Sequence, residues 1–155
     1  MIQRVQSIWL FLAVVTLICL FFLPLLTKTV DGNSYGVYTS GIHTENEATD
    51  VSVSGVEFAV IPITLSIGAI LLSFGAIFFY KNRRLQKNII LAAILFIIAL
   101  AASCFYIGQD LPGGTIGTSV TIGTFLPLLA TVFCLLAIRG IRKDEQLLKS
   151  ADRLR

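Results

Sequence analysis

The chain has 155 residues, of which 55% are hydrophobic and 14% charged, and its formal net charge is +3 at pH 7. A typical soluble domain is about 45–50% apolar and about 25% charged, so this chain has too little polar surface to cover a soluble fold of its size. The charges are clustered between long apolar tracts, which excludes an ordinary soluble domain and predicts a membrane protein with four spans.

The first predicted span covers residues 8–26 and follows a short polar lead that carries Arg4. As a helix this tract would be about 28 Å long, close to the roughly 30 Å hydrocarbon core of a bilayer. A signal peptide has a shorter apolar region followed by a small-residue cleavage site, and no such site follows here. The tract is therefore predicted to be a retained span.

Residues 27–57 form the only long polar segment, with one lysine, Lys28, against five acidic residues. Two pieces, Tyr35–Tyr38 and Val51–Phe58, favour strands, with Gly55 as a candidate bulge. We expect a small antiparallel hairpin that covers the outer end of the helices.

In the same segment His43, Glu45 and Glu47 alternate, so on a strand they would share a face. A weak cation site, or an enzyme acting at the membrane surface, could use them. A solvated acidic loop explains the same residues, and we predict no metal site.

The second and third spans are predicted at residues 58–79 and 89–107, joined by a segment with four cations and no acid: Lys81, Arg83, Arg84 and Lys87. Positively charged segments between spans stay in the cytoplasm. This one segment therefore places both termini inside. Small residues on one face of the second span predict close helix packing. They include Gly68, Ala69, Ser73 and Ala76.

The fourth span, residues 119–138, has a stripe of small residues at positions i, i+4, i+7, i+11 and i+14: Gly123, Pro127, Ala130, Cys134 and Ala137. This heptad spacing predicts a left-handed crossing of about +20° with a neighbouring helix. Pro127 predicts a kink, either a simple packing kink or a hinge. The tail, residues 139–155, can form an amphipathic helix. That helix could lie on the inner membrane surface, dock onto a partner or extend into solvent.

None of the four spans contains Asp, Glu, Lys, Arg or His. Ion-coupled transporters and haem proteins need such groups within the membrane, so both classes are disfavoured. The three cysteines, Cys19, Cys104 and Cys134, lie inside apolar tracts without metal or redox spacing. We predict no catalytic residue, no cofactor and no bound metal. Nucleic-acid binding is not expected, because the cations are not interleaved with aromatic residues.

Two end motifs, MIQRVQS at residues 1–7 and IRKDE at 141–145 followed by SADRLR at 150–155, resemble those of a family of small four-span inner-membrane proteins. That family, from Bacteroidota-type bacteria, has no assigned activity, so the resemblance carries over no catalytic residue. Both motifs face the cytoplasm in the predicted topology. We expect a contact surface there for the membrane or a partner, formed by Arg4, Lys81, Arg83, Arg84, Lys87, Arg142, Lys143, Asp144 and Glu145.

The sequence thus predicts one integral membrane domain over residues 1–155, an all-α bundle of four transmembrane helices with a hairpin-like loop. Its predicted partners are the lipid bilayer and other membrane protein subunits, and its predicted function is that of a non-enzymatic accessory subunit of a larger inner-membrane complex. The alternative is a small carrier or channel for an uncharged or lipidic substrate. That alternative would use the hydroxyl groups of Thr121, Thr124, Thr131 and Ser103.

Overall fold

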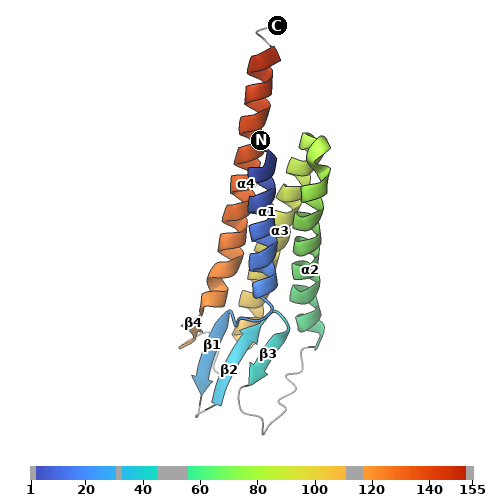
Figure 1. Cartoon of the computed structure of the whole chain (residues 1–155). Helices are drawn as coiled ribbons and strands as arrows, with labels where there is room; N and C mark the ends of the chain where they lie inside the picture. The colour runs from blue at the N-terminus through green and yellow to red at the C-terminus, as the bar shows by residue number, and fades with distance from the viewer. Residues whose placement is uncertain (1–2, 31–32, 45–55, 111–116, 153–155) are drawn as a thin grey trace.

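The computed structural model describes residues 3–30, 33–44, 56–110 and 117–152 (Figure 1). These residues form four α-helices and a small antiparallel sheet. The helices are α1 (Gln3–Cys19), α2 (Val56–Phe78), α3 (Arg83–Ile107) and α4 (Ile122–Asp152). Three of them contain stretches long and apolar enough to cross a membrane, namely Val60–Phe78, Arg83–Ile107 and Ile122–Leu147. The apolar part of α1, Gln6–Cys19, is shorter.

Successive helices run in opposite directions, so both termini and the α2–α3 connection lie at one end and the sheet lies at the other (Figure 1). We call these the basic end and the sheet end. Helix α1 packs mainly against α4, and α2 packs mainly against α3, with further contacts between α1 and α2 and between α3 and α4. The chain is therefore an up-and-down array in which each helix touches the next.

Each helix turns a heptad stripe of buried residues toward its neighbours. In α3 the buried positions are Gln86, Ile90, Ala93, Ile97, Leu100, Cys104 and Ile107. In α4 they include Gly123, Pro127, Ala130, Cys134, Ala137, Ile141 and Asp144. Spacings that alternate between four and three residues keep one face of a helix toward its partner when the pair supercoils to the left. Helix α4 runs unbroken through Pro127.

The sheet has the order β3-β2-β1-β4, with β1 at Leu26–Val30, β2 at Asn33–Tyr38, β3 at Gly41–Thr44 and β4 at Ser119–Val120. One face, with Leu26 and Val37, packs against Ile107 at the end of α3. The two residues Thr39 and Ser40 join β2 to β3, and Gly41 follows with a φ of 123°, which glycine adopts without a steric penalty. The sheet therefore closes the end of the bundle.

Pro24 limits how far α1 can run. Proline removes a backbone donor and disfavours helical geometry in the residue before it. The helix ends at Cys19, a turn follows, and the chain enters β1 at Leu26. The Leu25 amide donates to the Val37 carbonyl at 2.8 Å, and the hydroxyl of Thr124 donates to the Leu25 carbonyl. These bonds tie the end of the first apolar tract to β2 and α4.

The helix boundaries differ from the predicted span boundaries. The helix expected over residues 8–26 begins at Gln3 and ends at Cys19. Most of the segment expected as a loop at 81–88 belongs to α3, which begins at Arg83 after a short 3-10 turn, Phe79–Lys81. Residues 119 and 120, expected in the fourth span, form β4. Helix α2 begins at Val56 and ends at Phe78, close to the expected 58–79.

The polar segment at residues 27–57 is only in part as expected. Tyr35–Tyr38 lies in β2, and a small antiparallel sheet is present, as predicted. The second predicted strand, Val51–Phe58, is wrong for Val56–Phe58, which are helical. Gly55 and residues 51–54 lie outside the described ranges. The partners of β2 are β1 and β3, so the strands that pair with it come from residues 26–30 and 41–44.

The contact of Gly123 in α4 with the α1–β1 connection can be tested by mutation. A Cβ at this position would overlap the Pro24 carbonyl, whereas a Cβ at Gly75 in α2 would meet nothing within 4 Å. We expect Gly123→Ala to destabilise the fold by about 1–3 kcal/mol, because the α1–β1 connection must move away. Gly75→Ala should be neutral or stabilising, since alanine favours helix over glycine. Thermal unfolding in detergent, followed by circular dichroism, compares the two; equal melting temperatures would contradict the packing.

Candidate functional site

The basic end gathers most of the charged residues that the sequence singled out. Arg84, Arg142 and Lys143 are exposed, whereas Arg83, Lys87 and Glu145 are partly buried. The side chains of Arg4 and Lys81 lie outside the described part of the structure. Arg84 comes from the first turn of α3, and Arg142 and Lys143 come from α4, next to Asp144 in the sequence. The solvent-facing surface of this end is therefore cationic.

Beneath this surface Gln6 of α1 meets Asp144 of α4. The Gln6 amide Nε2 donates to Asp144 Oδ2, and both side chains are 7% exposed. Gly140, one turn before Asp144, makes room: a Cβ there would lie 3.0 Å from Gln6 Cγ. The two end motifs, which stand at opposite ends of the sequence, are thus packed against each other.

A second amide performs the same task between α2 and α3. Gln86 is 3% exposed, and its Nε2 donates to the backbone carbonyl of Ala76 at 3.0 Å. Gln6, Gln86 and Asp144 each occupy the basic-end position of a buried heptad stripe. We call these three residues the polar layer. It joins α1 to α4 and α3 to α2, the same pairs that make the closest helix contacts.

The polar layer is bordered by an ion pair and by two buried atoms without partners. Lys87 Nζ lies 2.9 Å from Glu145 Oε2, and both side chains are about one quarter exposed. Among the described residues Arg83 Nη1 and Asp144 Oδ1 are buried and have no hydrogen-bond partner. The partly exposed ion pair contributes little to stability, about 0–1 kcal/mol, whereas buried polar groups left unpaired are costly. The polar layer therefore affects the stability of this end more than the ion pair does.

The structure places the predicted packing residues inside the bundle. Ala69, Ser73 and Ala76 of α2 are fully buried, and Gly68 lies under the Phe96 ring, whose Cε1 would be 2.7 Å from an added Cβ. In α4 the whole stripe from Gly123 to Ala137 is buried. Both sets contact this chain's own helices. These two sets are therefore occupied within the described part of the chain.

The hydroxyl groups considered for a carrier are also engaged. Thr131 donates to the Pro127 carbonyl and Ser103 to the Leu100 carbonyl, each at 2.8 Å. Thr124 donates to the Leu25 carbonyl, and Thr121 Oγ1 lies 3.3 Å from Thr27 Oγ1. Serine and threonine in membrane helices commonly bond to backbone carbonyls in this way. These four groups therefore contribute to the packing of the chain.

At the sheet end His43 lies in β3, with its Nε2 2.7 Å from Ser40 Oγ. Glu45 and Glu47, considered with His43 as a cation site, lie outside the described residues. The described residues contain no cluster of three or more His, Cys, Asp or Glu side chains that could hold a metal ion. His43 is instead a polar member of the sheet surface.

Sequence reasoning missed Gln6 and Gln86 and placed Asp144 on a contact surface. The available signal was the heptad itself. Continued by four and then three residues, the stripe from Gly123 to Ala137 reaches Ile141 and Asp144, which are 0% and 7% exposed. A polar residue at the end of a buried stripe predicts a polar contact between helices.

Residues 2–154 match the family described as a domain of unknown function, DUF4293. The chain belongs to this family. Neither a curated protein nor a solved structure matches it. The match spans both end motifs, so Gln6 and Asp144 fall within the family domain.

The contact between Gln6 and Asp144 predicts an asymmetric response to mutation. Asp144→Ala leaves the buried Gln6 amide without an acceptor and should destabilise the protein by about 1–3 kcal/mol. Replacing both residues by leucine should cost less than the sum of the single changes, because no buried polar group then lacks a partner. Melting temperatures of the single and double variants measure this coupling.

Lys143→Ala is the matched control, since this neighbouring charge is exposed. It should change stability by less than about 0.5 kcal/mol. An Asp144→Ala protein as stable as Lys143→Ala would refute the polar layer as a stabilising contact.

Proposed function

We propose that this protein crosses the bacterial inner membrane four times, with both termini in the cytoplasm, and acts as a non-enzymatic subunit that docks onto other membrane proteins through its basic end. The proposal rests on the separation between an apolar surface and a charged one. The flanks of the helices expose hydrocarbon side chains such as Leu71, Leu95 and Leu128, and the exposed cations gather at one end. Such a surface fits lipid around the helices and water beyond the basic end.

The short helix α1 is compatible with a fourth span. Its 17 residues correspond to about 26 Å, and the apolar residues Leu20 to Leu25 continue the tract. Backbone outside helices is tolerated at membrane depth where protein groups satisfy it. Here Thr39 Oγ1 donates to the Leu20 carbonyl at 3.3 Å, and Leu25 bonds to Val37 at 2.8 Å. These contacts support a span completed by the turn before β1.

The proposed partner contact lies at the basic end because the small-residue stripes are occupied within the chain. Arg84, Arg142 and Lys143 present three exposed cations there. The matching partner surface is acidic and lies at the cytoplasmic ends of neighbouring membrane helices. Electrostatic complementarity of this kind sets the rate and specificity of association.

Site-directed labelling tests the topology. In a background with the three native cysteines replaced by alanine, Ser40→Cys should react with a membrane-impermeant maleimide in intact cells. Arg84→Cys should react only after the membrane is permeabilised, because it lies at the opposite end of the bundle. Labelling of both sites from the same side would exclude the four-span arrangement.

Copurification tests the docking surface. The tagged protein, extracted in mild detergent, should recover specific membrane proteins, and the charge reversals Arg142→Glu and Lys143→Glu together should reduce this recovery at least ~10-fold. His43→Ala, at the sheet end, is the matched control and should leave it unchanged. Recovery of the unmodified protein as a lone, monodisperse monomer would contradict a role as a subunit.

A further inference from the structure

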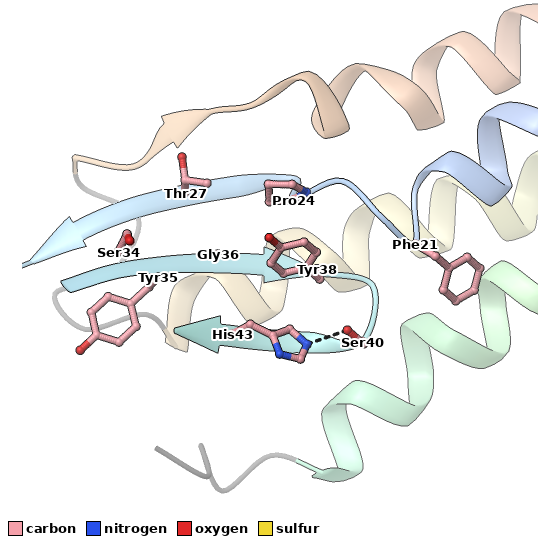
Figure 2. A pocket seen from close by; sticks show the side chains of 9 residues that line it. All are labelled: Phe21, Pro24, Thr27, Ser34, Tyr35, Gly36, Tyr38, Ser40 and His43. Atoms are coloured by element: carbon pink, nitrogen blue, oxygen red, sulfur yellow. Dashed lines mark hydrogen bonds between the residues drawn. The ribbon is translucent and has the colours of Figure 1, made fainter. Parts of the chain in front are cut away.

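A cavity of about 440 Å³ lies on the sheet, at its junction with the end of α1 (Figure 2). The strand register places Thr27, Gly36 and His43 side by side on β1, β2 and β3. Because successive side chains of a strand point to opposite faces, these residues lie on the face opposite Leu26 and Val37. The cavity is thus on the outer face of the sheet, away from its contact with α3.

Glycine at position 36 shapes the floor of this cavity. A Cβ there would lie 2.8 Å from Tyr38 Cε2, so the Tyr38 ring rests directly on the strand. The ring also packs edge-to-face against His43, with centroids 5.2 Å apart and an interplanar angle of 83°. Two neighbouring rings and a flat backbone form a fixed surface that is aromatic on one side and polar along its rim.

The polar groups around this surface are neutral hydroxyls and one imidazole. Thr27, Ser34, Ser40, Tyr38 and His43 line the cavity, and Figure 2 shows Ser40 bonded to His43 at the turn between β2 and β3. None of the described residues that line it is Asp, Glu, Lys or Arg. A charged ligand would lose its hydration here without meeting an opposite charge, so the lining selects a neutral ligand with several hydroxyl groups.

Phe21 makes the two ends of the cavity different. This side chain comes from the turn after α1 and lines the end of the cavity that is nearest the bundle (Figure 2). Its neighbour Phe22 is 77% exposed. One end of the cavity is therefore apolar and adjoins the helices, whereas the other is lined by the hydroxyl-bearing strands.

We propose that this cavity binds a neutral carbohydrate of one or two sugar rings. The C–H face of a pyranose ring would lie on Tyr38, and the hydroxyl rim of the sugar would bond to the Ser, Thr and His side chains. The volume is at the lower end of the roughly 300–1,000 Å³ typical of small-molecule sites. The sugar comes either free in solution or as the headgroup of a glycolipid whose chains lie beside Phe21 and Phe22. This site is independent of the docking surface at the basic end.

The test uses the full-length protein in phosphatidylcholine nanodiscs. Isothermal titration calorimetry and saturation-transfer NMR with maltose, lactose and glucose 6-phosphate measure free sugars, and nanodiscs containing monoglucosyl diacylglycerol measure the lipid-linked form. We expect the neutral sugars or the glycolipid to bind at about 1 mM or tighter, and glucose 6-phosphate to bind more weakly. Tyr38→Ala should weaken binding at least ~10-fold, and Tyr38→Phe should weaken it less.

Tyr80→Ala is the matched control, because Tyr80 is an exposed tyrosine at the basic end; it should leave binding unchanged. If Tyr38→Ala does not fold, His43→Ala, an exposed position, carries the test with an expected loss of several-fold. Binding of the free disaccharides assigns a soluble sugar, and binding only in glycolipid nanodiscs assigns a lipid headgroup. No binding of either, equal binding by the variants, or tighter binding of glucose 6-phosphate would overturn the proposal.

Discussion

The heptad spacing of buried residues is the constraint on which the rest of this structure depends. In the membrane that we propose for this protein, helices gain nothing from the hydrophobic effect when they associate, so close packing of small side chains must supply much of the attraction. Ala69, Ala76, Ala130 and Ala137 are all fully buried at such positions. A stripe of this kind aligns each helix with its neighbours along its whole length. The residues at which the stripes end then form the two ends of the bundle.

At the basic end the stripes finish in polar residues, and at the other end they meet the sheet. Gln6 and Asp144 bond across α1 and α4, and Gln86 caps the contact between α3 and α2. A buried polar pair contributes less to stability than to register, because sliding one helix past the other would leave both groups unpaired. The polar layer therefore fixes the height of the helices relative to one another and keeps the exposed cations of α3 and α4 at the same end of the bundle.

Much of this arrangement was readable from local pattern, and the failures have physical causes. The stripe from Gly123 to Ala137 predicted a buried face, and the cations of residues 81–87 predicted a distinct end of the bundle. The burial of Asp144 was not predicted, because the prediction used its charge and not its position in the heptad. Strand β1 was missed because residue 26 was assigned to the predicted span and residues 27–30 to the polar segment after it. A local signal was present, since the two residues between β1 and β2 are Asp-Gly, which is typical of a hairpin turn. Pro24 likewise marked a point that α1 could not pass.

The sheet provides hydrogen-bond partners for the end of the first apolar tract. Helix α1 stops at Cys19, and the six residues that follow carry backbone groups that need partners outside a helix. The β2–β3 turn supplies the Thr39 hydroxyl to Leu20, and β2 supplies the Val37 carbonyl to Leu25. The Leu25 carbonyl accepts from the Thr124 hydroxyl of α4 and from the amide of Thr121, just before that helix. Two separate segments of the chain thus converge on one short turn. Gly123 lies against Pro24 at the same point, which explains why the second residue of α4 has no side chain. The outer face of the sheet is left free of this task, and it is there that the cavity over Gly36 lies.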